Sequence, residues 1–349
     1  MYEAMYDIRI ENIDLSTSER LKVESFLSTF NLFLDKDVEH TVVARIGNEI
    51  IGTCSSSGKV LKCFAVKEGF QDQGIASKLI TYITNQLFDR GIYETFIFTT
   101  PRNLALFKGL NYHEVQRVEE VVLLEGGMAN IKRYVEKMFK DSGLDKREKA
   151  ALVMNCNPFT LGHRYLIEKA SIENDEVVVF IVEEDRSLFP FEVRKNLAKI
   201  GTEDLKNVHV LSGGNYIISS ATFPAYFLRQ EDIRMNAYSN LDAEIFGEYI
   251  GPAFNIGKRY LGTEPYCNVT NQYNEALFKI LPKHGIEVIG IERLNIENKP
   301  ISASEVRRLI KTEDYHRIKS LVPKTIYEFI ISSQAKPIIE KIKRSDSPH

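Results

Sequence analysis

The chain has 349 residues, of which 44% are hydrophobic and 27% charged, and its 45 basic and 48 acidic side chains give a formal net charge of −3. This length is comfortable for two domains, and the balance of charge offers no broad basic surface for nucleic acid. No apolar run reaches the length of a membrane span, the first residues have no apolar signal core, and the four cysteines lack CxxC spacing. We therefore expect a globular cytoplasmic protein with reduced thiols that binds neither nucleic acid nor a membrane.

The first 125 residues combine antiparallel strand signals with helices, which predicts a mixed α/β domain. An amphipathic stretch from Ser16 to about Phe30 predicts a helix, and residues 74–90 predict a second helix that stops at Gly91. A short helix is expected over Asn103–Leu110. Strands separated by turn signals are predicted over Thr41–Ile46, Glu49–Ser56, Lys59–Val66, Tyr93–Thr99 and Tyr112–Val118.

Residues 126–148 have the composition of a helical linker. Gly126-Gly127 interrupts the strand pattern, a charged helix is predicted from Ile131 to about Asp141, and the polar stretch SGLDKREK follows. Because a new apolar strand starts at Ala150, the sequence predicts domain limits of 1–125, 126–148 and 149–349.

From Ala150 strands and helices alternate, which is typical of a Rossmann-like parallel sheet with helices on both faces. The predicted strands are Ala150–Asn155, Glu176–Val182, Val208–Ser212, Arg259–Leu261 and Glu287–Ile291. The predicted helices are His163–Ser171, Phe191–Ile200, Pro224–Glu231 and Val269–Leu281, with further short helices towards the end of the chain. Small molecules bind beyond the carboxyl ends of the strands in such sheets, so we expect the site there.

One strand-to-helix turn of the second domain has residues suited to phosphate. In VMNCNPFTLGHRYLIEKA, Thr160, Gly162 and His163 fall where the helix begins. Gly162 permits close approach of a ligand, the helix start offers N–H groups and a positive dipole, and an imidazole can donate to oxygens that gain charge. The alternative is that Asn157-Pro158 makes a simple turn and His163 is an ordinary early helix residue. The strand context and the TxGH spacing favour function.

A second stretch, NKPISASEVRRLI, pairs with the first. Ser302 with Glu305 three residues later predicts a capping box that opens a helix. A capped helix start is also an anion site, where Ser302, Ser304 and Arg307 would hold the β- and γ-phosphates of a nucleotide. This motif is weak by itself and gains its weight from TLGH upstream.

Two intermediate segments add candidate residues. Arg194 in FPFEVRKNL faces either phosphate or solvent, and Gly262 and Glu264 in RYLGTEPY follow a strand at the edge where a nucleotide would bind. Glu264 is alternatively an ordinary loop acid. No GxxxxGK[ST] loop occurs, which disfavours a Walker-type ATPase.

The first domain has a loop of its own that suits pyrophosphate. In AVKEGFQDQGIASKLI, residues Gln71, Gly74 and Ala76 resemble the Q/R-x-x-G-x-G/A loop of GNAT acetyltransferases, with Ala76 in place of the last glycine. RNLALFKGLNYHEV resembles the second signature of that family. The resemblance implies a GNAT-like fold whose backbone amides bind a coenzyme A-like group. It leaves open whether the domain transfers acetyl groups.

The second domain resembles the nucleotidyltransferase superfamily, because TLGH and ISASEVR are similar to its (H/T)xGH and ISSTxxR signatures. Ala303 and Ser304 depart mildly from the usual Ser and Thr. Together with GTEPYCNVTNQYNEAL and the GNAT-like module, these motifs make nearly the whole chain resemble the citrate lyase ligase family.

That resemblance implies an ATP-dependent ligase. It would activate acetate as acetyl-AMP and then acetylate the thiol of a phosphopantetheine-like prosthetic group on the citrate lyase acyl carrier subunit, releasing AMP and pyrophosphate, with Mg²⁺ on the phosphates. The implied catalytic residues are His163, Thr160 and Arg307. The implied ATP-binding residues are Asn157, Gly162, Arg194, Gly262, Glu264, Ser302 and Ser304, and the coenzyme A-like group would bind Gln71, Gly74 and Ala76.

Two other functions stay open at this point. One is an adenylyltransferase that acts on a phosphopantetheine-like or nucleotide phosphate. The other is an acetyl-CoA-dependent N-acetyltransferase whose second half is only a docking module.

Overall fold

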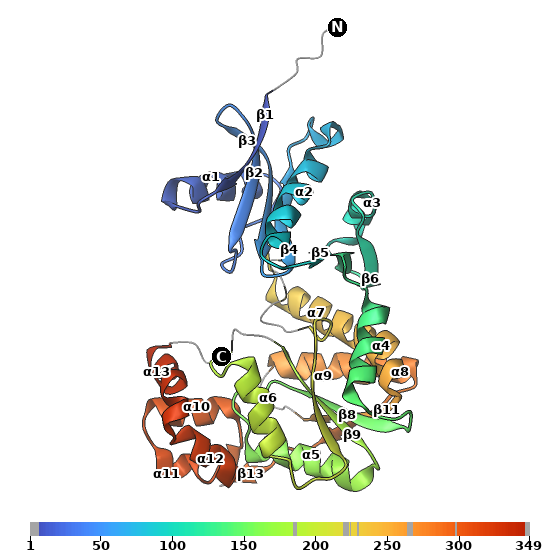
Figure 1. Ribbon diagram of the computed structural model, residues 1–349, viewed down its shortest axis with the longest axis vertical. Coiled ribbons are helices and arrows are strands. Elements are labelled where there is room, and N and C mark those ends of the chain that lie inside the picture. The colour runs from blue at the N-terminus through green and yellow to red at the C-terminus, as the bar shows by residue number, and fades with distance from the viewer. Residues whose placement is uncertain are drawn as a thin grey trace. The chain divides into compact units, whose positions relative to one another are not determined.

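The computed structural model describes residues 7–183, 187–218, 223, 225–228, 230–263, 268–296 and 299–345. It divides into two compact units, Met1–Tyr134 with Pro224–Ala237, and Val135–Phe223 with Tyr238–His349. Each unit combines a β-sheet with helices, which confirms the α/β class (Figure 1). These units are defined by packing, and the functional limits 1–125, 126–148 and 149–349 stay a prediction.

The first unit is built on a seven-stranded sheet with the order β1-β2-β3-β4-β5-β7-β6. Neighbouring strands are antiparallel except β4 and β5, which run parallel. The strands are β1 (Ile8–Ile13), β2 (His40–Ile46), β3 (Glu49–Ser57), β4 (Val60–Val66), β5 (Glu94–Thr99), β6 (His113–Arg117) and β7 (Val122–Gly127). The helices are α1 (Thr17–Ser28), η1 (Gln71–Gln73), α2 (Ile75–Phe88), η2 (Pro101–Asn103) and α3 (Leu104–Lys108), and α4 (Ile131–Ser142) follows.

Helix α2 packs on this sheet through one apolar stripe. Ile75, Leu79, Ile83 and Leu87 are buried and recur every four residues, so they lie on the face that contacts β2 and β3. Gly52 in β3 allows the close contact, because a Cβ atom there would be 3.0 Å from the side chain of Leu79. The stripe therefore fixes the position of the loop that precedes α2.

The interpretation of Gly126-Gly127 as a break in the pattern is wrong. Both glycines belong to the end of β7, which pairs with β5 and β6. A Cβ atom on Gly126 would lie 2.5 Å from the ring of Tyr112, and Gly127 has a φ of +69°. Close approach of an aromatic ring and a left-handed backbone thus require glycine at these positions without ending the sheet. Strands β1 and β7 are not among the predicted strands.

The second unit is built on a five-stranded sheet with the order β10-β9-β8-β11-β12. Every neighbouring pair is parallel, as predicted. The strands are β8 (Lys149–Met154), β9 (Val177–Ile181), β10 (Val208–Ser212), β11 (Ile256–Gly262) and β12 (Glu287–Ile291), and a small hairpin pairs β13 (Asn295–Ile296) with β14 (Lys299–Pro300).

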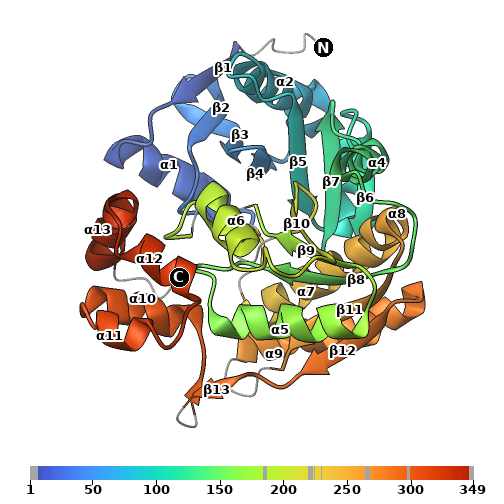
Figure 2. The ribbon, with the colours of Figure 1, turned by 60° about the horizontal axis from the view of Figure 1, so that its bottom comes forward.

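Helices lie against both faces of this sheet (Figure 2). Val179 and Ile181 in β9 face the core formed with α5, whereas Phe180 between them contacts Phe246 and Phe254 on the opposite face. The helices are α5 (Leu161–Glu173), α6 (Phe191–Ile200), α7 (Glu231–Ile245), the π-helical turn η3 (Phe246–Ile250), α8 (Gly251–Phe254), α9 (Asn268–Ile280) and η4 (Leu281–His284). At the end of the chain α10 (Ala303–Lys311), α11 (Tyr315–Ile318), α12 (Lys324–Ile330), η5 (Ser333–Ala335) and α13 (Lys336–Arg344) gather together (Figure 2).

The helix predicted over Pro224–Glu231 is wrong, because the described residues before Glu231 are not helical. The buried side chain of Tyr226 donates its hydroxyl hydrogen to the carbonyl of Phe98, and its own carbonyl accepts from the N–H of Phe33. The N–H of Ala225 donates to Asp35. These contacts within the first unit occupy groups that a helix would pair internally.

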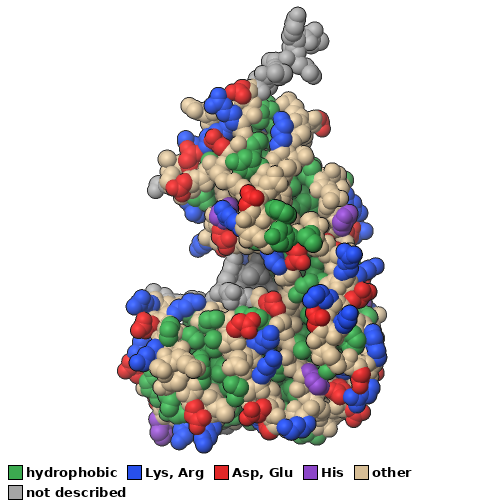
Figure 3. Space-filling model, in the orientation of Figure 1, with side chains coloured by type: hydrophobic (Ala, Val, Ile, Leu, Met, Phe, Trp, Pro, Cys, Tyr) green, Lys and Arg blue, Asp and Glu red, His purple; other side chains and the backbone are tan. Residues whose placement is uncertain are grey.

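No helix within the described residues is both long enough and apolar enough to cross a membrane. On the face that Figure 3 shows, Lys and Arg side chains are interspersed with Asp and Glu on each unit.

Candidate active site

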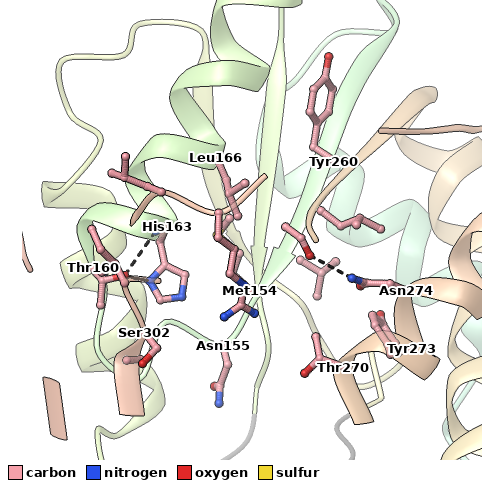
Figure 4. Close-up of a pocket in the computed structure, with 18 of the residues that line it drawn as sticks. Met154, Asn155, Thr160, His163, Leu166, Tyr260, Thr270, Tyr273, Asn274 and Ser302 are labelled. Carbon is pink, nitrogen blue, oxygen red and sulfur yellow. Dashed lines mark hydrogen bonds between the residues drawn. The ribbon is translucent and has the colours of Figure 1, made fainter. Parts of the chain in front are cut away.

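A pocket opens at the carboxyl ends of β8 and β11 in the second unit. Its volume of about 370 Å³ is within the range of small-molecule sites. Figure 4 shows Thr160, His163 and Ser302 on one side of it, and Tyr273 and Asn274 on the other. The pocket therefore lies where the parallel topology places ligands.

Thr160 and His163 form the capped start of α5. The hydroxyl of Thr160 accepts from the N–H of His163 at 3.4 Å, and the N–H of Thr160 donates to Nδ1 of His163 at 3.0 Å. The imidazole thus takes the role that a glutamate usually has in a capping box. Because Nδ1 accepts this hydrogen bond, the ring proton is on Nε2.

The imidazole of His163 is held neutral. Burial lowers its pKa to about 4, and the positive charge of Arg293 acts in the same direction. Figure 4 shows the ring turned towards the pocket, so that Nε2–H is available as a neutral donor. A neutral donor suits an oxygen that gains negative charge during a reaction.

A second helix start meets the same pocket. Ser302 caps α10 by accepting from the N–H of Glu305 at 3.2 Å, as the predicted capping box requires. The reciprocal half of the box is missing, because the Glu305 carboxylate pairs with Arg308 instead. At Gly162 a Cβ atom would lie 3.2 Å from the carbonyl of Ile301, which explains the small residue between the two helix starts. Two positive dipole ends therefore face one cavity.

The wall beneath the pocket is held by a fully buried arginine. Arg194 donates to the carbonyls of Asn155, Val182 and Phe189 at 2.8–3.0 Å and to the side-chain oxygen of Asn155 at 2.7 Å. It ties the ends of β8 and β9 to the start of α6. This network positions the side chain of Asn155, which lines the pocket.

Arg307 and Asn157 form a second buried link. Arg307 in α10 donates to the carbonyl of Asn157, and the side-chain oxygen of Asn157 accepts from the N–H of Phe189 at 3.0 Å. Burial lowers the pKa of the Arg307 guanidinium. The contact joins the turn before α5 to α10, so the two helix starts are fixed relative to each other.

The structure brings together five of the ten residues predicted for this site. Thr160, Gly162, His163, Gly262 and Ser302 line the pocket. The buried Asn157, Arg194 and Arg307 lie behind its wall, the exposed Ser304 contacts Ser302 at 3.1 Å, and Glu264 lies outside the described residues. Their predicted contacts with ATP stay predictions.

Several lining residues were not found from the sequence. Asn155 directly follows the end of β8 and Arg293 lies two residues after the end of β12, positions that could have marked them in a parallel sheet. Arg259, Tyr273 and Asn274 give no such signal, because they lie within a strand and a helix that look ordinary.

The loop predicted for a coenzyme A-like group belongs to the first unit. Gln71 is exposed in η1, Gly74 is the N-terminal cap of α2 with a φ of +70°, and Ala76 is buried in the first turn of that helix. A Cβ atom on Gly74 would meet nothing within 4 Å. Glycine is thus needed here for its left-handed conformation, and the helix start is open on its outer side.

Comparison with known proteins decides the family. Residues 149–330 match the model of the citrate lyase ligase C-terminal domain, and residues 3–112 match the acetyltransferase (GNAT) family. The citrate (pro-3S)-lyase ligase of Escherichia coli is 36% identical over 88% of this chain and 89% of its own length, and that of Klebsiella pneumoniae is 34% identical over 89% and 92%. The Haemophilus influenzae ligase is 34% identical over 93% of this chain and 98% of its own.

The chain belongs to the citrate lyase ligase family. It is therefore an enzyme of the ligase class with a GNAT-like fold in its N-terminal part. The resemblance of nearly the whole chain to the citrate lyase ligase family is confirmed by these relatives.

Proposed function

We propose that this ligase works in the cytoplasm and uses ATP to activate acetate, then acetylates the prosthetic-group thiol of the citrate lyase acyl carrier subunit. The observation that carries the proposal is the neutral Nε2–H of His163 at the capped start of α5, inside a pocket that α10 also faces. The names of the relatives supply citrate lyase as the object of the reaction.

In the first step, a carboxylate oxygen of acetate attacks the α-phosphorus of ATP. The new bond joins that oxygen to phosphorus, the bond to the bridging oxygen breaks, and pyrophosphate leaves with its electron pair. His163 donates Nε2–H to the phosphate oxygens, while the starts of α5 and α10 stabilise the added negative charge. The hydroxyl of Ser302 is a further donor at the leaving group.

In the second step, the carrier thiolate attacks the acyl carbon of acetyl-AMP. A carbon–sulfur bond forms, the bond from the acyl carbon to the phosphate oxygen breaks, and AMP leaves. This step needs no covalent intermediate on the protein, so positioning and charge stabilisation account for most of the rate.

The lining of the pocket fits two anionic substrates. Arg259 and Arg293 line it, and its described lining residues include no acid. The described residues also contain no group of three metal-ligating side chains, so the phosphates of ATP would hold Mg²⁺. When bound, Mg²⁺ neutralises charge on the departing pyrophosphate.

We assign Arg194, Arg307 and Asn157 to positioning. Each is buried and contacts the backbone of the turn between β8 and α5 or of the segment before α6. Through these contacts they set the geometry of Asn155, Thr160 and His163.

Exchange of labelled pyrophosphate into ATP tests the proposal without the carrier protein. We expect exchange that requires acetate, because adenylation is reversible and needs no thiol. The relatives' function would not apply to this chain if exchange ignored acetate and required a phosphorylated acceptor, which is the behaviour of an adenylyltransferase. Acetyl transfer from acetyl-CoA without ATP would identify an N-acetyltransferase instead.

A further inference from the structure

Arg259 is the most deeply buried charged group of the pocket. It lies in β11, its relative exposure is 2%, and it lines the cavity. Tyr260, the next residue along the strand, contacts Glu173 and Asn174 at the end of α5. Because successive side chains of a strand point to opposite faces, Arg259 lies on the face away from α5, beside Phe246 and Tyr273.

Two of the three guanidinium nitrogens of Arg259 lack an acceptor. Neither Nε nor Nη1 has a hydrogen-bond partner within the described parts of the chain. The ring of Phe246 lies 4.4 Å from Cζ and offers only its π face. Buried donors of a charged group are rarely left in this state, since they have lost their hydration without compensation.

The nearby acid does not supply the missing partner. Asp242 in α7 accepts from the hydroxyl of Tyr273 at 2.6 Å and from the N–H of Ile218 at 2.9 Å. Both oxygens of Asp242 are thus engaged by other donors. The hydroxyl of Tyr273 and the negative charge of Asp242 stabilise the Arg259 cation, but burial has the larger effect and lowers its pKa.

The two sides of the pocket suit different anions. Thr160, His163 and Ser302 form the side with the helix starts (Figure 4). A triphosphate is stabilised most strongly there, because helix N-termini bind anions. Tyr273 and Asn274 come from α9 on the other side (Figure 4). Leu277, one turn further along α9, also lines the cavity and is 1% exposed.

We propose that Arg259 binds the carboxylate of the acid substrate, with the methyl group of acetate against Leu277. This assignment rests on the proposed function, since it names the residue that recognises the acid to be activated. One carboxylate oxygen accepts from the guanidinium, and the other attacks the α-phosphorus. A compact apolar wall next to a buried cation selects small monocarboxylic acids.

Phosphate is the other oxyanion that an arginine can bind here. We favour the carboxylate because Arg259 lies on the face of the sheet opposite α5, whereas the phosphate donors cluster at the starts of α5 and α10. If Arg259 binds the carboxylate, the KM for acetate depends on it. If it binds phosphate, the KM for ATP does.

The test compares Arg259→Gln and Arg259→Lys with wild type in pyrophosphate exchange. We expect the KM for acetate to rise roughly 10- to 100-fold in Arg259→Gln, the effect of losing a charged hydrogen bond, with the KM for ATP nearly unchanged. Arg259→Lys should recover part of the loss. Lys258→Gln, at a half-buried neighbour outside the pocket lining, is the matched control and should change neither constant.

Equilibrium dialysis with labelled acetate separates this assignment from the proposed function. In one outcome, the wild type binds acetate without showing exchange, while Arg259→Gln does not bind acetate. This result would overturn the proposed function and keep the assignment of Arg259. An unchanged acetate affinity in folded Arg259→Gln, or a rise in the KM for ATP alone, would overturn the assignment.

A second variant guards against misfolding at Arg259. Leu277→Ala enlarges the cavity beside the proposed methyl site and leaves the guanidinium in place. We expect propionate and butyrate to gain relative to acetate in the exchange assay. The same acid preference as wild type would show that the acid binds elsewhere.

Discussion

His163 caps a helix, and the role that we propose for it in the pocket uses a different atom of the same ring. Its Nδ1 accepts the Thr160 N–H and completes the cap of α5, which leaves the opposite ring nitrogen as the donor in the pocket. The alternative interpretation, in which His163 is an ordinary early helix residue, therefore accounts for Nδ1. It does not exclude the predicted role, since that role uses the other nitrogen.

Replacing His163 with Ala should lower the rate of pyrophosphate exchange by roughly 10²–10³, the scale for losing one transition-state donor. Stability should fall by only about 1 kcal/mol, because a single cap contact is lost. His209→Ala is a matched control, since it removes another half-buried imidazole, paired with Glu176, outside the pocket lining. Full activity in folded His163→Ala would remove the residue from the mechanism.

The low pKa of His163 also predicts a pH dependence of stability. Its pKa is about 4 in the folded protein and near its ordinary 6.5 when unfolded, so the unfolded state binds more protons between these values. The free energy of unfolding that His163 contributes is complete above pH 6.5 and is lost as the pH falls towards 4. Urea unfolding at pH 7 and pH 5 should show the advantage of wild type over His163→Ala shrinking at the lower pH. An advantage that grows on acidification would mean that the folded imidazole is easily protonated.

At the scale of elements, the pocket depends on where two helices begin. Residues 155–160 connect β8 to α5, and residues 301–302 connect the hairpin of β13 and β14 to α10. Arg307 holds the two together through the carbonyl of Asn157. The geometry of the pocket therefore depends on the segments that precede α5 and α10 and on the Arg307 contact between them. It does not depend on any single helix.

The cap of α10 provides a test at this scale. Ser302→Ala should cost about 1 kcal/mol of stability, the usual value for a lost cap, and should also raise the KM for ATP about tenfold because a donor to phosphate is removed. Asp314→Ala removes a similar cap, the acceptor of the Arg317 N–H in α11, away from the pocket. It should lower stability without affecting the KM for ATP. Equal kinetic effects of the two variants would mean that Ser302 acts only through folding.

How far the sequence predicts these elements depends on whether the signal is local. The parallel sheet, α2, α5 and the cap at Ser302 follow from periodicity and spacing, and all are present. The predicted helix at Pro224–Glu231 failed because Tyr226 and Ala225 bind residues far earlier in the chain.

The residues of the site also differ in whether a local sequence signal identifies them. TxGH spacing identifies Thr160 and His163, since both functions arise within one turn of helix. Arg259 meets Tyr273 only through the packing of β11 on α9, and its importance lies in burial without acceptors. No sequence pattern reports that property.

At the scale of the whole molecule, each of the two units contains its own candidate phosphate-binding site. The pocket of the second unit contains the residues that we propose for activating an acid, whereas Gly74 caps a helix start in the first unit. A carrier-bound prosthetic group resembles coenzyme A in its chemistry. We expect the first unit to bind that group and the second to perform adenylation.

Gly74→Asp compared with Gly74→Asn tests this division of work. Both side chains have the same shape, tolerate a left-handed backbone better than other residues, and enter open space at the cap of α2. Only the aspartate places negative charge where backbone N–H groups would meet a phosphate. We expect both variants to keep acetate-dependent pyrophosphate exchange, and Gly74→Asp alone to lose acetylation of the carrier thiol. Thermal unfolding of the two variants checks that the left-handed backbone at residue 74 lowers their stability equally. If Gly74→Asp acetylates the carrier as fast as Gly74→Asn does, the loop is a remnant of the GNAT-like fold and the carrier is bound elsewhere.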